Sequence, residues 1–154
     1  MVSKMARFKG ESVKNDTYYS DTKIAHIRTR NEKGETIFCI KNKTLTKGVE
    51  ANTEMEWKIS DPKQWNKTLG KIGIKSSVKK FKRSESYEWK GFHIELNHIT
   101  RLGYYLEIET MVNKEEDVSK AKQELIDLFK RLGYSQKAFE KRYYLELLAM
   151  KNKK

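Results

Sequence analysis

Two pairs of glutamates, each separated by a single residue, stand in segments with the alternating pattern of a β-strand. The first pair is Glu54 and Glu56, and the second is Glu107 and Glu109. Because successive side chains of a strand point to opposite faces, both carboxylates of a pair lie on one face, opposite apolar residues. Carboxylate oxygens are hard ligands that suit Mg²⁺ or Mn²⁺. The pairs therefore predict acidic strand faces that can hold a divalent cation.

Basic residues with strand-like spacing occur on other segments. Arg28 and Arg30 share one face of an alternating run, Lys41 lies on the next run and Lys82 on a later one. Guanidinium and ammonium groups bind phosphate oxygens directly, while divalent cations bridge carboxylates to phosphates. If the acidic and basic faces meet, they suit the binding of a polyphosphate together with a metal ion.

Alternation and turn signals divide the 154 residues into six strands and three helices. The strands are expected at 23–31, 35–43, 53–60, 76–89, 92–99 and 103–112, with a polar loop between the second and third. The helices are expected at 60–73, 115–132 and 135–150. Short turns between neighbouring strands favour a single, mainly antiparallel α+β domain over residues 1–154.

The charge balance indicates an anionic partner. There are 33 Lys and Arg against 21 Asp and Glu, a formal net charge of +12, which suits nucleic acid, a membrane surface or a phosphorylated small molecule. Cys39 is the only cysteine, which excludes an intramolecular disulfide and a cysteine-rich zinc site and fits a reducing cytoplasm. No apolar run approaches the ~20 residues that cross a bilayer, so we expect a cytoplasmic protein without a membrane span.

The charged strand faces allow two architectures. In the first, an open antiparallel sheet covers one face with helices and leaves the charged face in water. In the second, the sheet closes into a barrel whose lumen is lined by the charged faces. Alternation alone does not distinguish them.

The segment "NHITRLGYYLEIET" resembles the Leu-Gly turn and E-x-E strand of the CYTH superfamily, the triphosphate tunnel metalloenzymes. Six further segments resemble other motifs of this superfamily and occur in the order in which the family has them. The similarity runs from Phe8 to Met150 and is greatest to small class IV adenylyl cyclase-like members. The six segments are "KNDTYYSDT", "IRTR", "FCIKN", "TEMEWKISD", "KKFKRSESY" and "KRLGYSQKAFEKRYYLELL".

The resemblance implies an antiparallel β-barrel with helices packed outside, which binds ATP or inorganic triphosphate with Mg²⁺ or Mn²⁺. Its implied activities are those of a class IV adenylyl cyclase or a triphosphatase. The implied phosphate-binding residues are Arg28, Arg30, Lys41 and Lys82, and the implied metal-site carboxylates are Glu107, Glu109, Glu54 and Glu56.

The sequence departs from the family pattern in three places. The family's opening E-x-E-x-K strand and helix are absent from "MVSKMARFKGESVKNDT", so we expect a barrel that is incomplete at the N-terminus. Asn97 replaces an acidic residue before the Leu-Gly turn, and Ser84 replaces an arginine, with Arg83 displaced by one position. An incomplete barrel exposes two strand edges, which predicts a homodimer or strand exchange.

Three functions therefore remain in competition. The first is an active cyclase-like or triphosphatase enzyme that displaces a group at phosphorus with the help of metal. The second is a degenerate, non-catalytic domain that still binds nucleotide or polyphosphate. The third is a basic nucleic-acid-binding protein that uses "KSSVKKFKR" as an electrostatic patch. The tunnel needs the strand that carries "KKFKR", so nucleic acid is not expected as the partner.

Overall fold

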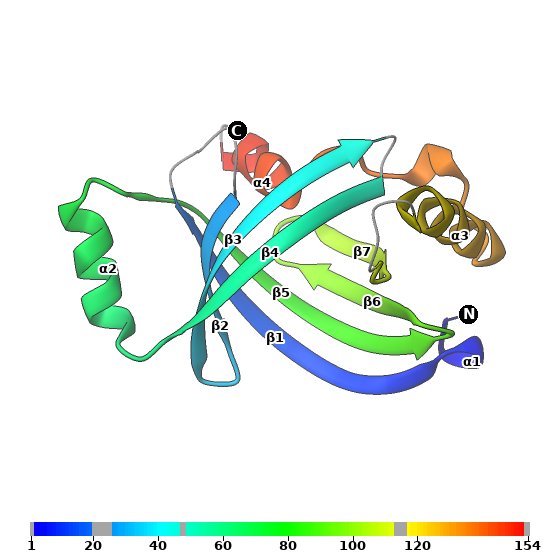
Figure 1. Ribbon diagram of the computed structural model, residues 1–154, viewed down its shortest axis with the longest axis horizontal. Coiled ribbons are helices and arrows are strands. Elements are labelled where there is room, and N and C mark those ends of the chain that lie inside the picture. Colours follow the sequence, from blue (N-terminus) through cyan, green and yellow to red (C-terminus); the bar gives the residue numbers. More distant parts are fainter. Residues whose placement is uncertain (1, 20–25, 47–48, 113–116, 153–154) are drawn as a thin grey trace.

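The computed structural model describes residues 2–19, 26–46, 49–112 and 117–152. Seven strands form one antiparallel sheet that curls into a half-barrel (Figure 1). In spatial order the strands are β4 (Val49–Ile59), β3 (Glu35–Thr46), β2 (His26–Glu32), β1 (Arg7–Tyr19), β5 (Ser76–Trp89), β6 (Phe92–Ile99) and β7 (Gly103–Glu109). The predicted antiparallel α+β class is therefore confirmed.

Strand β1 lies at the centre of the sheet, although alternation alone predicts no strand before residue 23. It pairs with β2 on one side and β5 on the other. Polar residues on both faces, such as Lys14, Asn15 and Asp16, remove the apolar period from its sequence. Residues 14–19 of the segment that resembles the family's Tyr-Tyr-Asp-Thr strand form its second half, and the rest of that segment lies outside the described residues.

Two predicted turns are confirmed. Lys33 and Gly34 join β2 to β3, and Lys90 and Gly91 join β5 to β6, all four with positive φ. Positive φ at both central residues is the geometry of the two-residue hairpin that suits the twist of an antiparallel pair. These turns set the register of the charged faces across each hairpin.

Three predicted boundaries are wrong, the first because β7 ends at Glu109 and not at residue 112. The polar segment after residue 43 is not a loop, because β3 continues to Thr46, β4 begins at Val49, and the two strands pair along this whole length. The helix predicted at 135–150 is divided into a 3₁₀ helix, η2 (Gln136–Ala138), and α4 (Tyr144–Asn152). Between them the side chain of Glu140 accepts hydrogen bonds from the amides of Lys141 and Arg142, which compete with helical bonding.

The remaining helices flank the sheet. They are α1 (Val2–Met5), α2 (Pro62–Lys71) and α3 (Val118–Arg131). As predicted, Asp61 caps α2 by accepting from the Gln64 amide at 2.9 Å. α3 packs its leucines on the apolar faces of β6 and β7, where Ile94 is fully buried, and this contact forms the main core. In the part of the chain described, no helix is long and apolar enough to cross a membrane.

The sheet has two open edges. β4 and β7 stand at the ends of the strand order and have no further neighbouring strand among the described residues. Unpaired backbone groups at such edges favour pairing with another strand. Pairing with a second copy of the chain stays a prediction.

Candidate functional site

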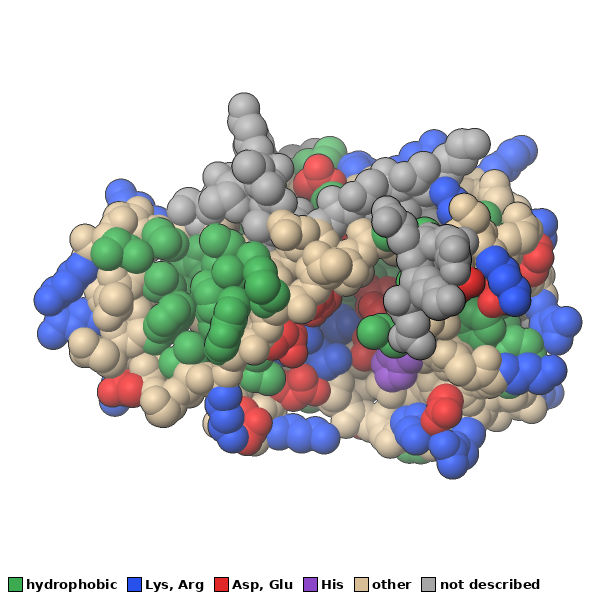
Figure 2. Space-filling model, in the orientation of Figure 1, with side chains coloured by type: hydrophobic (Ala, Val, Ile, Leu, Met, Phe, Trp, Pro, Cys, Tyr) green, Lys and Arg blue, Asp and Glu red, His purple; other side chains and the backbone are tan. Residues whose placement is uncertain are grey.

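The charged strand faces line one open cavity on the concave side of the sheet. Its volume is about 2610 Å³, and acidic and basic side chains are visible inside the hollow (Figure 2). The prediction that the charged faces line an interior is thus confirmed. All eight residues singled out from the sequence contribute to this lining: Arg28, Arg30, Lys41, Glu54, Glu56, Lys82, Glu107 and Glu109.

A buried carboxylate, Asp16, lies at the centre of a cationic cluster. Arg30 donates to both of its oxygens, at 2.8 and 3.2 Å, and the Lys80 ammonium lies 3.0 Å away. Arg28 approaches the same carboxylate at 3.9 Å. The register explains the convergence, since Asp16 is paired with Arg30 across β1 and β2 and with Lys80 across β1 and β5. One anion therefore organises three cations.

The ionisation state of this cluster follows from its contacts. Burial by itself would raise the pKa of Asp16, but the hydrogen bond from Arg30 and the charge of Lys80 hold that pKa well below its ordinary value. Asp16 therefore stays charged at neutral pH. Three cations around one carboxylate leave a surplus of positive charge at the cavity wall.

Arg28 has unused hydrogen-bonding capacity. Its side chain is only 9% exposed, and its two nearest carboxylates, Asp16 and Glu54, lie at 3.9 and 3.6 Å, beyond hydrogen-bond distance. Its Nε has no hydrogen-bond partner among the described residues. Because both ion pairs are long, the guanidinium of Arg28 is incompletely neutralised where it lines the cavity, which suits an anionic ligand.

A second cluster, called the acidic cluster below, brings two glutamates together and balances them with two lysines. The Lys82 ammonium donates to Glu95 at 2.5 Å and to Glu107 at 3.0 Å. Lys14 donates to the other oxygen of Glu95 at 3.1 Å. Burial alone would raise the pKa of both glutamates, but the charge of Lys82 lowers it. Two ionised carboxylates therefore converge on one cation.

The two central departures from the family pattern are partners in this cluster. Ser84 and Asn97 are a register pair across β5 and β6, and the Ser84 hydroxyl donates to the Asn97 amide oxygen at 2.6 Å. The Asn97 amide in turn donates to Glu107 at 2.8 Å. The family pattern expects an arginine and an acid at these positions. A neutral hydrogen bond thus stands where a charged pair is expected, and the net charge of the site is the same.

A third cluster lies on β3 and β4. Lys41 donates to Glu54 at 2.7 Å and contacts Glu50 at 3.0 Å. Ligand atoms of Cys39, Glu54 and Glu56 all lie within 4.8 Å of one another. Burial raises the pKa of the Cys39 thiol, so this group stays protonated at neutral pH. The ionised ligands here are carboxylates.

Helix α4 joins the cationic and acidic clusters. The ring of Tyr144 lies beneath the Lys80 ammonium, 5.4 Å from it, and packs edge-on against Tyr105. Burial, followed by the charge of Glu107 and a hydrogen bond to it, raises the pKa of the Tyr144 phenol. Tyr144 is therefore a neutral donor that touches both clusters.

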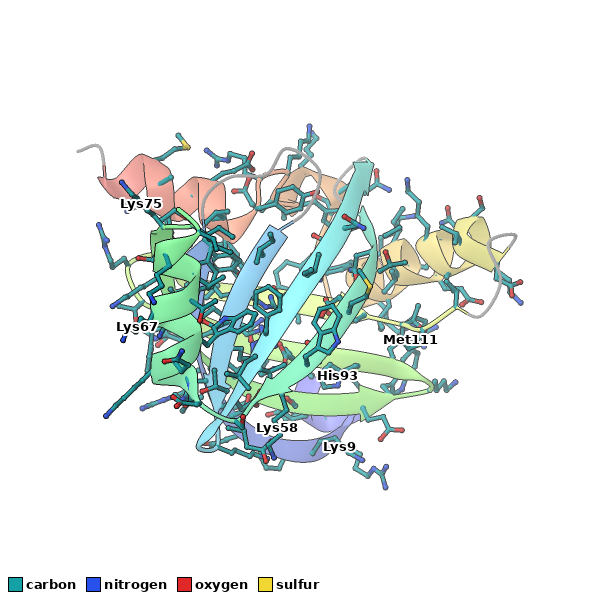
Figure 3. All side chains as sticks on the ribbon, turned by 60° about the vertical axis from the view of Figure 1, so that its left-hand side comes forward. Lys9, Lys58, Lys67, Lys75, His93 and Met111 are labelled. Carbon is teal, nitrogen blue, oxygen red and sulfur yellow. The ribbon has the colours of Figure 1, made fainter. Side chains whose placement is uncertain are left out.

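Sequence reasoning did not single out several members of the clusters. Asp16 and Lys14 lie on β1, where polar residues on both faces remove the alternating pattern of a strand. Tyr144 lies in a helix whose position depends on tertiary contacts. Strand alternation does assign Glu95 to the charged face of its strand, together with His93, which lies on β6 (Figure 3) and lines the cavity. The motif "NDTYY" was the available signal for Asp16, and "HIELN" for Glu95.

Among the described residues, the carboxylates brought close enough to share a cation are Glu54 and Glu56, beside Cys39, and Glu95 and Glu107, on Lys82. Glu95 and Glu107 already share one cation in Lys82, and Glu109 lines the cavity one register pair from Glu107, opposite His93. Oxygen ligands of this kind suit Mg²⁺ or Mn²⁺, whereas the protonated Cys39 thiol is a poor partner for either.

Comparison with known proteins agrees with this geometry. A match to the CYTH domain covers residues 4–144. The curated protein "Putative adenylate cyclase MJ0240" of Methanocaldococcus jannaschii is 26% identical over 121 residues, which are 79% of this chain and 69% of that protein.

Two solved structures from Pyrococcus horikoshii OT3 share the fold. The PH1819 protein has a TM-score of 0.84 and 28% identity, covering 97% of this chain and 90% of its own. The PH1012 protein has a TM-score of 0.83 and 25% identity, covering 93% and 86%. The CYTH family is a metal-dependent superfamily that binds triphosphate substrates. Since the domain match spans most of the residues that build the sheet and the cavity, this chain belongs to the CYTH family.

Proposed function

We propose that the concave cavity binds a triphosphate-bearing small molecule, ATP or inorganic triphosphate, together with Mg²⁺ or Mn²⁺. We further propose that the chain acts on it as a class IV adenylyl cyclase-like enzyme or as a triphosphatase. The observation that carries the proposal is the cationic cluster on the cavity wall, in which Arg28, Arg30 and Lys80 surround the single carboxylate of Asp16. Phosphate oxygens can neutralise the positive charge that this one carboxylate leaves over.

The cationic cluster supports binding of a chain of phosphates. Arg30 and Lys80 are held in place by Asp16, so their ordering is already complete before a ligand arrives. Preorganised cations of this kind lose little conformational entropy on binding and stabilise charge that develops on phosphate oxygens. Lys41, on β3, extends the positive wall. In the proposed reaction these groups orient the triphosphate and neutralise its charge.

The acidic cluster supports binding of the metal. Glu107, Glu109 and Glu95 are the residues that would hold the ion, which supplies Lewis-acid activation at phosphorus when it is bound. Tyr144 donates to Glu107 and packs beneath Lys80, which fixes the position of one carboxylate relative to the cationic wall. The name of the Methanocaldococcus relative supports the cyclase outcome.

One observation favours the alternative of a non-catalytic binding domain. Lys82 occupies the point where Glu95 and Glu107 converge, and it is only 6% exposed. A cation already present at this point competes with a metal ion for the same oxygens. In the alternative, the cavity binds nucleotide or polyphosphate without turning it over.

Turnover of ATP and of tripolyphosphate, measured with Mg²⁺ and separately with Mn²⁺, tests the proposal. Separation of the products distinguishes cyclic AMP from released phosphate, and calorimetric binding on the same sample reports occupancy. Metal-dependent product formation supports the enzyme. Binding of tripolyphosphate by a folded sample without any turnover supports the non-catalytic alternative, and the absence of both binding and turnover contradicts the proposal as a whole.

A further inference from the structure

The basic run "KKFKR" at residues 79–83 is divided between the two faces of β5. Lys80 and Lys82 point into the cavity, where they contact Asp16 and the two glutamates of the acidic cluster. Strand alternation sends Lys79, Phe81 and Arg83 to the opposite, outer face, where all three are exposed. The tunnel therefore uses only half of the basic run.

The outer half continues into an aromatic row across neighbouring strands. Arg83 is paired with His98 on β6, and His98 is paired with Tyr104 on β7. The rings of His98 and Tyr104 lie 4.8 Å apart. Tyr104 is 86% exposed and Phe81 is 38% exposed, so both rings are open to solvent. Strands lie ~4.8 Å apart, so the row from β5 to β7 is about 10 Å long.

The cations of this face differ from those of the cavity in their partners. Lys79 and Arg83 have no carboxylate or hydrogen-bond partner within the described ranges, whereas Lys80 and Lys82 are both paired with carboxylates. The acidic pair Glu11 and Glu85, on β1 and β5, lies one step further along the same face and limits the patch at that end. The result is a basic patch with exposed rings between the charges.

We propose that this outer face of β5, β6 and β7 is a binding site for single-stranded nucleic acid. Arg83 and Lys79 bind the phosphates, and the exposed rings of Tyr104 and Phe81 stack with bases. A sheet face that presents rings beside cations suits unpaired bases, because a duplex buries its base faces in its own stack. A polyphosphate has no bases that can stack on aromatic rings, so the exposed rings favour nucleic acid over polyphosphate at this site.

The site does not depend on the proposed cavity function, because its side chains lie on the opposite face of β5 from Lys80 and Lys82, although Arg83, His98 and Tyr104 also border the open rim of the cavity. The sequence argues against nucleic acid as a partner because the tunnel needs the strand that carries "KKFKR". Since the side chains of β5 alternate between its two faces, the same strand can serve both sites.

Fluorescence anisotropy with a labelled 12-nucleotide oligouridine that has a 5′-hydroxyl end tests the proposal on the whole chain. Stacking on an aromatic side chain contributes a factor of roughly 5 to 100 in affinity, so Tyr104→Ala should raise Kd by at least about 5-fold. Arg83→Ala should reduce the slope of log Kd against log salt by about 1. Circular dichroism confirms that each variant is folded.

Matched controls separate the site from bulk charge. Lys67→Ala removes an exposed lysine from α2 (Figure 3), and Tyr134→Ala removes a tyrosine that is 49% exposed; neither should change Kd. Equal effects of Arg83→Ala and Lys67→Ala would overturn the proposal, as would equal affinity for a duplex or for polyglutamate of the same charge. Displacement of the oligonucleotide by tripolyphosphate would place it in the cavity instead and would also overturn the proposal, as would no binding at all.

Discussion

The two central charge clusters of the cavity are built on the same two strands but differ in their balance of charges. On β1 and β5, the register pair Asp16 and Lys80 belongs to a cluster in which one carboxylate holds three cations. The next inward-facing pair along the same strands, Lys14 and Lys82, belongs to a cluster in which Glu95 is shared by two cations and Lys82 holds two carboxylates.

One sheet face thus presents two kinds of ligand site. A surplus of guanidinium and ammonium groups suits phosphate oxygens, and a convergence of carboxylates suits a metal ion. A metal-bound triphosphate carries both charges, and under the proposed function it would span both clusters. Each cluster also depends on one central group, Asp16 in the first and Lys82 in the second, so removal of either group should have a distinct signature.

The largest effect is expected for Asp16→Asn. Removal of one partner from a buried ion pair costs about 3–5 kcal/mol of unfolding free energy, because the remaining charges are left buried without compensation. Chemical denaturation at pH 7 measures this loss. The control is Asp127→Asn on α3, where the carboxylate is exposed, and no measurable change is expected there. Equal stability of the two variants would contradict the central role of Asp16.

Lys82→Met should lower the free energy of unfolding about as much as Asp16→Asn does, but here a bound metal ion should reverse the loss. Glu95 and Glu107 then repel each other without a shared cation, so the variant should be less stable than the wild type in a chelating buffer. Saturating Mg²⁺ or Mn²⁺ should restore stability, by about 2.7 kcal/mol at 100 times Kd. Thermal unfolding with and without metal measures this. Failure of metal to stabilise Lys82→Met more than the wild type would show that the carboxylates do not form a metal site.

A smaller effect is expected from restoring the charged pair at Ser84 and Asn97. Asn97→Asp alone places a third carboxylate beside Glu107 and should destabilise the fold, and Ser84→Arg in the same chain should reverse part of that loss. The coupling free energy of the double-mutant cycle should exceed about 0.5 kcal/mol, since the two side chains are in contact. Additive single effects would mean that the two departures from the family pattern are unrelated.

The smallest effect is expected in the pH dependence of the unfolding free energy. The pKa values of Asp16 and Glu95 are lowered in the folded state, so their stabilising contribution is present above the ordinary carboxyl range near pH 4 and is lost as the pH falls through the folded values. The difference in unfolding free energy between wild type and Asp16→Asn should therefore be constant from pH 5 to 7 and shrink below about pH 4. A difference that grows on acidification would contradict the ionised state of Asp16.

Much of the cavity could be predicted from the sequence because strand alternation is a local property. The spacing of Arg28 and Arg30, or of Glu107 and Glu109, assigns both members of a pair to one face without knowledge of the neighbouring strands. The hairpin turns at Gly34 and Gly91 are local signals for the same reason. Six of the seven strands follow from such patterns.

The partners of these residues could not be predicted, because pairing depends on register between distant strands. Ser84 and Asn97 look like two separate losses in the sequence and form one hydrogen bond in the structure. Asp16 lies on a strand with polar residues on both faces, so nothing local marks it as the centre of a cluster. The position of Tyr144 depends on the break at Glu140, which a helical pattern from 135 to 150 conceals.

The most direct test of the triphosphate site is a calorimetric titration of tripolyphosphate into the wild type and into Arg28→Ala in the presence of Mg²⁺. Hydrogen bonds to charged groups contribute about 1.5–3 kcal/mol, which corresponds to a loss of roughly 10- to 150-fold in affinity for the variant. Lys67→Ala, which removes an exposed cation from α2 away from the cavity lining, is the matched control and should bind as the wild type does. Unchanged affinity of a folded Arg28→Ala variant for tripolyphosphate would contradict the proposal that the cavity is a triphosphate site.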